Sequence, residues 1–398
     1  MIIWFAALIP FIGAGALFWI WNRKVALWEA LVMMVVPLGL IASAKGCSEY
    51  SQTQDTEFWG GYVTTAEYYE DWNERVSCRH PIPCSHPSYS TDSKGKRYQS
   101  GYQHSNDGHY HSYDVDYHPE YWEVNTSVRE TKEISHGFFE NLCKQFGNRV
   151  FVDLHRNYHT KNGNKYVATW KGEAETIEPV TVARSYENRV QASQSVFNFK
   201  TVNPADYGLF QYPAIQGLRQ QCVMGPGATE VSEKKFQYLN ATLGGSKQVR
   251  LFVLVFQNQP IQAAMEQEAF WKRGNKNELV TCIGVDKDLE VQWSHVFSWT
   301  EVDELKIEAR NQVMGMKKLD LAAYADWLGP MVQSKWVRKN FADFNYLTVE
   351  PTMSAVIWTF VLTLLVTIGI GVWAVLNNID NDGTFLGSHS FELGRRWR

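Results

Sequence analysis

The chain has 398 residues, a formal net charge of −4 and a pI near 6.3, and its mean hydropathy is −0.31. This length allows two or three units of ordinary domain size. The charge gives no global signal for nucleic acid or acidic lipid, so no nucleic-acid partner is expected. The mean hydropathy hides an uneven distribution, because the apolar residues are concentrated at the two ends of the sequence.

Two apolar runs open the chain. Residues 2–21 contain no charge, and residues 25–44 contain only Glu29. A helix needs about 20 apolar residues to span a bilayer, so both runs are predicted to be transmembrane helices that form a hairpin over residues 1–45. A buried core helix is the alternative for each run. A signal peptide is the alternative for the pair, but a long apolar run ahead of the basic loop is not typical of one.

A third charge-free run covers residues 353–376 and predicts a transmembrane helix over residues 351–378. The short loop Asn22-Arg23-Lys24 is basic, and basic residues in short loops stay in the cytoplasm. The large region between the second and third spans is then exported. The tail, residues 379–398, is cytoplasmic, which suits its cluster of arginines.

The first part of the exported region, residues 46–205, is expected to be rich in β-strands. Residues 62–76 alternate in polarity, which predicts that one strand face carries Tyr62, Ala66, Tyr68, Trp72 and Val76. Further strand candidates are 120–128, 165–173 and 180–193, and Asn162-Gly163 is a hairpin turn signal. One helix interrupts them, with Ser135 as N-cap, an apolar stripe of Phe138, Phe139, Leu142 and Phe146, and Gly147 as its end.

The second part, residues 206–350, predicts an α/β sandwich. Residues 248–256 are an apolar strand, and 260–274 begin with proline and end at glycine, as a helix does. Two more strands, 278–286 and 290–299, are separated by a short turn. Two helices follow at 301–315, with Thr300 as the expected cap, and at 320–337. The overall prediction is a membrane-anchored α+β protein with three transmembrane helices, whose exported β-rich domain precedes the α/β domain.

All six cysteines lie in the exported region, where disulfides are permitted. Cys78, His80, Cys84 and His86 fall within nine positions and offer four of the usual zinc ligands. Their spacing departs from that of structural zinc sites, and outside the cytoplasm Cys78 and Cys84 oxidise more readily to a disulfide. Three alternatives stay open for this cluster: a disulfide, which is favoured, a zinc site, or neither.

A second cluster, His104, Asp107, His109 and His111, has better geometry for a metal. His109 and His111 would share one face of a strand, about 6.6 Å apart, and a turn at Asp107-Gly108 would bring His104 opposite. Zinc is therefore the candidate cofactor. The alternative is an exposed polar strand rich in Tyr, His and Asp, which needs no ligand.

Known catalytic motifs are absent from the sequence. It contains no G-x-S-x-G, no P-loop, no H-E-x-x-H and no G-x-G-x-x-G after a strand.

The element order of residues 248–316, followed by a membrane span, resembles the TPM-type domain, a small α/β module of membrane-tethered proteins. The stretches "DTEFWGGYVTTAEYYEDW", "TDSKGKRYQ", "YHPEYWEV" and "FWKRGNKNELVTCIGVD" make the whole chain similar to uncharacterised membrane proteins of tailed bacteriophages and their bacterial hosts. This resemblance implies an envelope context and supplies no catalytic residue.

Two functions follow as hypotheses. The first is a non-enzymatic protein of the bacterial inner membrane that presents residues 46–350 on the periplasmic side to a protein partner; its 16 Trp and 19 Tyr suit binding surfaces. The alternative is a zinc-dependent hydrolase whose site joins His109, His111 and a carboxylate such as Asp107 or Asp114.

Overall fold

The computed structural model describes residues 2–20, 27–73, 84–105, 117–154, 162–193 and 202–380. The chain divides into two compact units. Residues 1–57, 185–201 and 340–398 form the first, which we call the helical unit. Residues 58–184 and 202–339 form the second, the polar unit, and each unit is described by itself.

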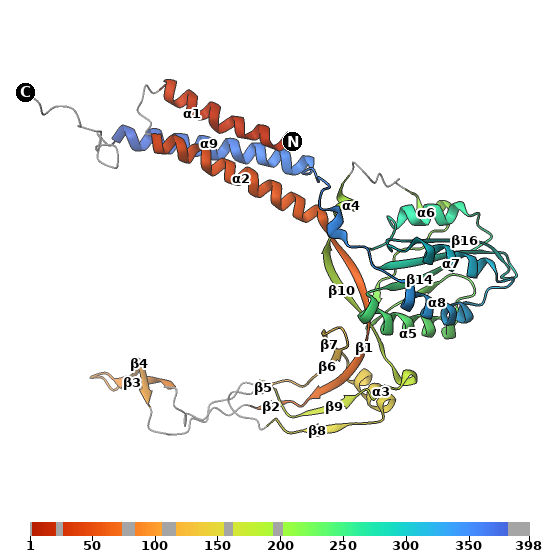
Figure 1. The fold of residues 1–398 in the computed structure, drawn as a ribbon. Coiled ribbons are helices and arrows are strands. Elements are labelled where there is room, and N and C mark those ends of the chain that lie inside the picture. The colour runs from red at the N-terminus through yellow and green to blue at the C-terminus, as the bar shows by residue number, and fades with distance from the viewer. Residues whose placement is uncertain are drawn as a thin grey trace, which may run out of the picture. The chain divides into compact units, whose positions relative to one another are not determined.

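Three apolar helices build the helical unit and pack against one another (Figure 1). They are α1 (Leu8–Ile20), which the 3₁₀ turn η1 (Ile2–Ala7) precedes, α2 (Leu27–Thr53) and α9 (Met353–Asp380). Stretches of α2 and α9 are long and apolar enough to cross a membrane, at residues 31–53 and 353–376, with mean hydropathies of 1.7 and 2.4. The first predicted span appears as a shorter apolar helix, residues 2–17.

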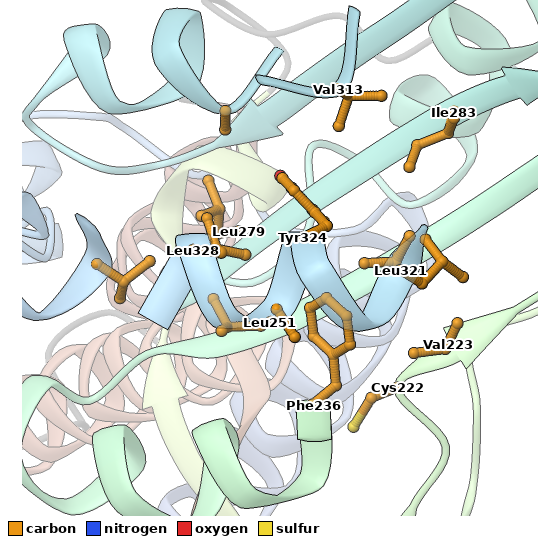
Figure 2. Packing of buried hydrophobic residues seen from close by; sticks show 14 of the residues in the cluster. Cys222, Val223, Phe236, Leu251, Leu279, Ile283, Val313, Leu321, Tyr324 and Leu328 are labelled. Carbon is orange, nitrogen blue, oxygen red and sulfur yellow. The ribbon is translucent and has the colours of Figure 1, made fainter. Parts of the chain in front are cut away.

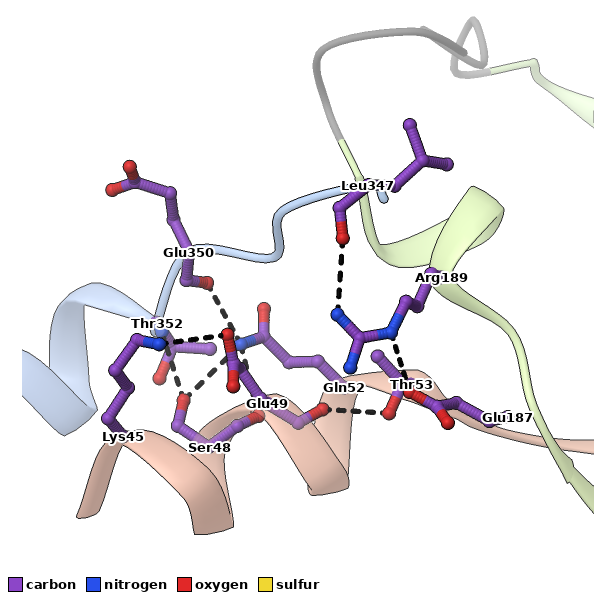
Figure 3. A network of polar contacts seen from close by, with 10 residues as sticks. All are labelled: Lys45, Ser48, Glu49, Gln52, Thr53, Glu187, Arg189, Leu347, Glu350 and Thr352. Carbon is purple, nitrogen blue, oxygen red and sulfur yellow. Dashed lines mark hydrogen bonds and ion pairs between the residues drawn. The ribbon is translucent and has the colours of Figure 1, made fainter. Parts of the chain in front are cut away.

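Hydrogen bonds join the end of α2 to the segment that leads into α9, as Figure 3 shows. We call the residues that form them the polar collar: Ser48, Gln52, Arg189, Leu347, Glu350 and Thr352. Ser48 Oγ accepts a hydrogen bond from the backbone N–H of Thr352 at 3.2 Å, and Gln52 Nε2 donates to the carbonyl of Glu350 at 3.0 Å. The short helix α4 (Arg189–Ala192) joins them, because Arg189 donates to the Leu347 carbonyl at 3.2 Å. The helix α2 therefore continues nine residues past the predicted end at residue 44, up to Thr53, and its last turns are polar.

The β-rich portion of the polar unit is an antiparallel sheet of order β7-β6-β1-β9-β8, with β10 paired to β1 beside this path. Its strands are β1 (Gln54–Tyr69), β6 (Tyr121–Thr126), β7 (Thr131–Glu133), β8 (Val150–Val152), β9 (Lys165–Thr169) and β10 (Pro179–Glu187). Two small separate sheets pair β2 (Trp72–Asn73) with β5 (Tyr117–His118) and β3 (Cys84–Thr91) with β4 (Arg97–Ser105).

The predicted helix with Ser135 as its N-cap is α3 (His136–Phe146), which covers one face of this sheet. Ser135 accepts a hydrogen bond from the backbone N–H of Phe138, and Gly147 ends the helix in the left-handed conformation. Phe139, Leu142 and Phe146 are buried against Val63, Ala66 and Val124 of the sheet. The predicted apolar stripe is therefore the core-facing side of the helix.

The prediction that alternate residues of 62–76 all lie on one strand face is wrong, because β1 contains a bulge between Val63 and Thr65. An extra residue in a strand reverses which side chains face the core. Val63, Ala66 and Tyr68 consequently share the core face, whereas Tyr62 packs on Trp170. Trp72 belongs to β2 and stacks on His118, and Val76 lies outside the described residues.

Asn162-Gly163 was predicted as a hairpin turn, but the structure gives another reason for a glycine at position 163. The strands β8 and β9 do pair, with Val152 opposite Lys165, but Gly163 is not among the glycines with positive φ. A Cβ atom at Gly163 would lie 2.0 Å from the Glu70 carbonyl oxygen. The glycine therefore permits a close backbone approach to the end of β1.

The α/β portion has a four-stranded sheet of order β13-β14-β15-β16. The first three strands are parallel and β16 is antiparallel. The strands are β13 (Val223–Met224), β14 (Arg250–Gln257), β15 (Glu278–Val285) and β16 (Val291–Ser298). A small hairpin of β11 (Ile215–Gln216) and β12 (Arg219–Gln220) precedes it, as do the 3₁₀ turns η2 (Ala174–Thr176) and η3 (Pro204–Asp206).

Helices cover both faces of this sheet, because alternate residues of each strand face opposite sides. Leu251 and Ile283 face α5 (Glu230–Lys247), α7 (Asp303–Met314) and α8 (Leu321–Lys335), where Phe236 and Tyr324 complete the core (Figure 2). Phe252 and Cys282 face α6 (Gln262–Phe270) on the other side. The predicted strands and helices of this portion are confirmed; α5 was not predicted.

The start of α7 differs from prediction. Thr300 is not the cap of α7: the helix begins after Val302, whose backbone N–H donates to Thr300 Oγ1 at 3.2 Å. The chain then leaves the polar unit after Lys339 and reaches α9 through the 3₁₀ turn η4 (Phe341–Phe344).

Candidate functional site

Most residues of the predicted metal clusters lie outside the described residues: Cys78, His80, Asp107, His109 and His111. The described backbone places His104 opposite Ser85 in the β3–β4 hairpin, whose turn is at Asp92–Gly95. Cys84 and His86 lie on β3 of the same hairpin. Within the described ranges, no group of three or more His, Cys, Asp or Glu side chains is arranged to hold a metal. The zinc site and the Cys78–Cys84 disulfide stay predictions.

Four cysteines among the described residues are free thiols: Cys47, Cys143, Cys222 and Cys282. Cys222 is fully buried, and burial raises the pKa of its thiol to about 11. A neutral thiol packs as a small apolar group, so Cys222 belongs to the core of the α/β portion.

Cys282, His295 and Glu268 bring together the residue types of a catalytic triad. Cys282 and His295 are cross-strand partners, and His295 Nε2 lies 2.7 Å from Glu268 Oε2. Cys282 is fully buried, however, and burial raises the pKa of its thiol well above its ordinary value. A nucleophilic cysteine needs an accessible thiolate, so this cluster is a structural ion pair beside a core thiol.

A groove with a volume of about 1270 Å³ lies between the β-rich and α/β portions of the polar unit. We call it the α3–α5 groove. Residues of the helices α3, α5 and α8 and of two other stretches, 174–179 and 216–221, line it. The lining residues are Gln145, Ala174, Glu175, Ile177, Glu178, Pro179, Gln216, Arg219, Gln221, Glu230, Glu233, Lys234, Lys235, Gln237, Tyr238, Leu239, Ala325 and Asp326.

The helix α5 forms one wall, and its first turn is fixed by a capping box. Thr229 Oγ1 accepts from the backbone N–H of Ser232 at 3.1 Å, and Ser232 Oγ accepts from the backbone N–H of Thr229 at 3.0 Å. Two otherwise unpaired backbone donors of the helix start are satisfied in this way. The helix therefore begins at a defined residue and presents Lys234 and Tyr238 to the groove.

Arg219 and Glu178 form the strongest polar contact of the opposite wall. Arg219 donates two hydrogen bonds to Glu178, from Nε to Oε1 at 2.8 Å and from Nη2 to Oε2 at 2.6 Å. The Glu178 side chain is 4 % exposed and that of Arg219 is 48 % exposed. This bidentate geometry fixes the β11–β12 hairpin against the start of β10.

The other charges of the groove are mostly compensated. Lys234 pairs with Glu230 at 2.6 Å, which lowers the pKa of Glu230, and Lys235 pairs with Asp326. Glu233 accepts from the backbone N–H of Cys222 at 3.0 Å and of Val223 at 2.8 Å, so it supports the chain entering β13.

The lining carries an excess of acid. It contains five carboxylates and three basic side chains, and Glu175 is exposed without an ion-pair partner among the described residues. The described lining contains no Ser, Thr, Cys or His, and its one hydroxyl group is the phenol of Tyr238.

No sequence motif marks this groove, because its residues come from stretches far apart in the chain. One local signal exists: Thr229 and Ser232, spaced as a capping box, predict the start of α5. Which side of α5 faces the groove depends on tertiary packing.

Comparisons with protein-family models, with curated proteins and with solved structures found no match.

Proposed function

We propose that the chain is an integral protein of the bacterial inner membrane, and that its polar unit faces the periplasm and binds a protein partner in the α3–α5 groove. Membrane insertion, sidedness and partner binding rest on different observations.

The polarity of α9 is the observation that carries membrane insertion. Its buried polar residues are threonines, with Thr359, Thr363 and Thr367 between 0 % and 3 % exposed. Its outer side chains are apolar, and Leu365 and Leu376 are about 60 % exposed. A helix of a water-soluble protein has the opposite arrangement, whereas lipid favours apolar side chains outside and small polar ones between helices.

The helices α1 and α2 support the same proposal. Ile12 and Val35 are more than 60 % exposed, and residues 2–20 carry no charge. Gly13 allows α1 to approach closely, since a Cβ atom there would lie 2.8 Å from Thr367 Cγ2 of α9. We therefore retain α1 as the third membrane helix. The polar collar around Ser48 and Gln52 is then the end of the membrane part.

Sidedness rests on the distribution of basic residues. The short loop Asn22-Arg23-Lys24 joins α1 to α2 and belongs in the cytoplasm, which places the collar and the polar unit on the periplasmic side.

The chemistry of the groove supports a polypeptide partner. Its volume exceeds that of ordinary small-molecule pockets, which span roughly 300–1,000 Å³. Its acid excess, and Glu175, for which the described part of the chain offers no ion-pair partner, favour a segment that carries lysine or arginine.

Cys47 tests the sidedness, because it is exposed and directly precedes Ser48 of the collar. Intact spheroplasts would be treated with a membrane-impermeant maleimide, and the labelled residue would be identified by mass spectrometry. We expect Cys47 to react before lysis. Labelling only after lysis would contradict the periplasmic orientation.

Partner binding is tested by photo-crosslinking in cells. A photoreactive residue would replace Gln216 at the groove or, as a control, exposed Asn311 of α7. We expect a discrete protein adduct at position 216 that is lost on Glu175→Lys and absent at position 311. The same adducts at both positions, or none at 216, would exclude the groove as the binding site.

A further inference from the structure

A groove with a volume of about 640 Å³ lies between α1 and α9 of the helical unit. Its lining residues fall within 9–17 of α1 and 364–376 of α9, and Met33 of α2 joins them. Thr367 is the only described lining residue with a polar side chain, and its Oγ1 is buried. The described lining therefore offers a hydrocarbon surface and no accessible polar atom of a side chain. We call it the α1–α9 groove.

The helices α1 and α9 lie side by side and run in the same direction (Figure 1). A Cβ atom at Gly13 would lie 2.8 Å from Thr367 Cγ2, and one at Gly371 would lie 2.9 Å from Leu17 Cδ1. Both pairs are 354 positions apart in the sequence, so the two helices keep one register along the groove. Residues separated by this interval consequently lie at the same level of the helical unit.

Exposed tryptophans mark two such levels. Trp4 and Trp358 are 354 positions apart, and so are Trp19 and Trp373, which follow them by fifteen positions on each helix. All four side chains are at least 45 % exposed. Tryptophan is enriched where a membrane-spanning helix meets the two interfaces between lipid and water. In the proposed orientation, the level of Trp19 and Trp373 is the cytoplasmic interface.

The length and width of the α1–α9 groove limit what can occupy it. On α9 its lining starts near the midpoint between Trp358 and Trp373 and continues to Leu376. The rise from Leu364 to Leu376 is about 18 Å, close to one leaflet of a hydrocarbon core about 30 Å thick. A volume of about 640 Å³ over this length leaves a mean cross-section of roughly 35 Å², less than half that of a helix about 10 Å wide.

We propose that the α1–α9 groove binds one acyl chain of a phospholipid of the cytoplasmic leaflet, with the headgroup at the level of Trp19 and Trp373. This inference rests on the membrane insertion and orientation proposed above. Every lipid tail is already surrounded by hydrocarbon, so van der Waals packing in the preformed groove is what distinguishes the bound chain from its neighbours. The exposed indole N–H groups can donate to ester or phosphate oxygens at the interface.

The test uses cells that express the full chain and incorporate a photoactivatable fatty acid into their phospholipids. Irradiation of their membranes should label groove residues such as Ile368 and Val372, and also Leu365, which is exposed outside the groove. After purification in a mild detergent, irradiation should label groove residues only. Native mass spectrometry of the same sample should find one phospholipid per chain.

Val372→Phe fills part of the groove, and Leu365→Phe is the matched control on the same helix. The two side chains are 53 % and 59 % exposed, so the larger ring disturbs little buried packing at either position. We expect Val372→Phe to lower the retained phospholipid at least five-fold and Leu365→Phe to leave it unchanged. The positions labelled in the wild type supply a measurement that does not depend on either variant.

The outcomes separate the lipid site from membrane insertion. Labelling in membranes without phospholipid after purification, or equal retention by both variants, would overturn the lipid site and leave insertion standing. A dimer without lipid in the native mass spectrum would mean that a second copy of the chain covers the groove. Absence of labelling in the membranes would overturn insertion and the lipid site together.

Discussion

Gly60 of β1 and Gly244 of α5 cross backbone to backbone within the polar unit. A Cβ atom at Gly244 would lie 2.2 Å from the Gly60 carbonyl oxygen, and one at Gly60 would lie 2.0 Å from the Asn240 carbonyl oxygen. Real side chains do not fit such distances, so only glycine permits this crossing. The crossing joins the β-rich portion to the α/β portion, and the α3–α5 groove lies between the same two portions.

Gly244→Ala should therefore destabilise the polar unit. The atom in the way is backbone and cannot rotate aside, so β1 or α5 must shift, at a cost of about 1–3 kcal/mol of unfolding free energy. Denaturant unfolding of the full chain in detergent, followed by tryptophan fluorescence, measures this loss.

Gly245→Ala is the matched control on the same helix. A Cβ atom at Gly245 meets nothing within 4 Å, and alanine is the better helix former by up to about 1 kcal/mol. Stability should stay equal or rise. Equal losses for both variants would show that the close crossing does not determine stability.

Arg219→Ala should lower the unfolding free energy by more than is usual for a side chain as exposed as that of Arg219. The change leaves Glu178, which is 3 % exposed, without its bidentate partner, at a cost of about 1–3 kcal/mol. Arg219→Lys should recover only part of the loss, because an ammonium cannot donate two parallel hydrogen bonds. Lys234→Ala is the control, since its partner Glu230 is exposed, and it should change the denaturation midpoint little. A smaller loss for Arg219→Ala than for Lys234→Ala would contradict this account.

The Glu268 cluster predicts a pH dependence of stability. Burial raises the pKa of Glu268, but the hydrogen bonds from His295 of β16 and from Arg273 outweigh burial, so the pKa lies below its ordinary value of 4.5. A lowered pKa in the folded state stabilises the fold above the unfolded pKa, and this stability is lost as the pH falls through the folded value. Unfolding free energy should fall more steeply below pH 4.5 in the wild type than in Glu268→Gln. Parallel pH profiles would contradict the assignment.

Gly13→Val should separate α1 from α9. A Cβ atom at Gly13 would lie 2.8 Å from Thr367 Cγ2 and 3.0 Å from Met33 Cε, so valine forces the helices apart. We expect a lower midpoint of thermal unfolding in detergent. Gly15→Val is the control, because nothing lies within 4 Å of a Cβ atom there. If both variants lower the midpoint equally, the loss reflects valine in α1 and not helix contact.

The elements that the sequence predicted well are those whose signals are local. The cap Ser135, the apolar stripe and Gly147 defined α3, and the strands β14 and β15 were found because both of their faces are buried, which makes their sequences apolar runs. The face assignment of β1 failed because its bulge at Val63 depends on pairing with β6, which the strand itself does not encode.

The contacts around the α3–α5 groove could be predicted even less from local sequence patterns. The pairing of Arg219 with Glu178 and the crossing of Gly60 and Gly244 join residues that are 41 and 184 positions apart in the sequence. No spacing rule predicts such contacts. The histidine clusters, by contrast, were visible in the sequence, and zinc binding there stays a prediction that elemental analysis of the purified chain would check.

Membrane insertion can be tested by alkaline carbonate extraction of membranes from cells that express the full chain. We expect the chain to stay in the membrane pellet after extraction at high pH and in urea, and to enter solution only with detergent. Release by carbonate or urea alone would mean that α2 and α9 do not cross the bilayer. The exposed apolar side chains of α9 would then have to be covered by another protein.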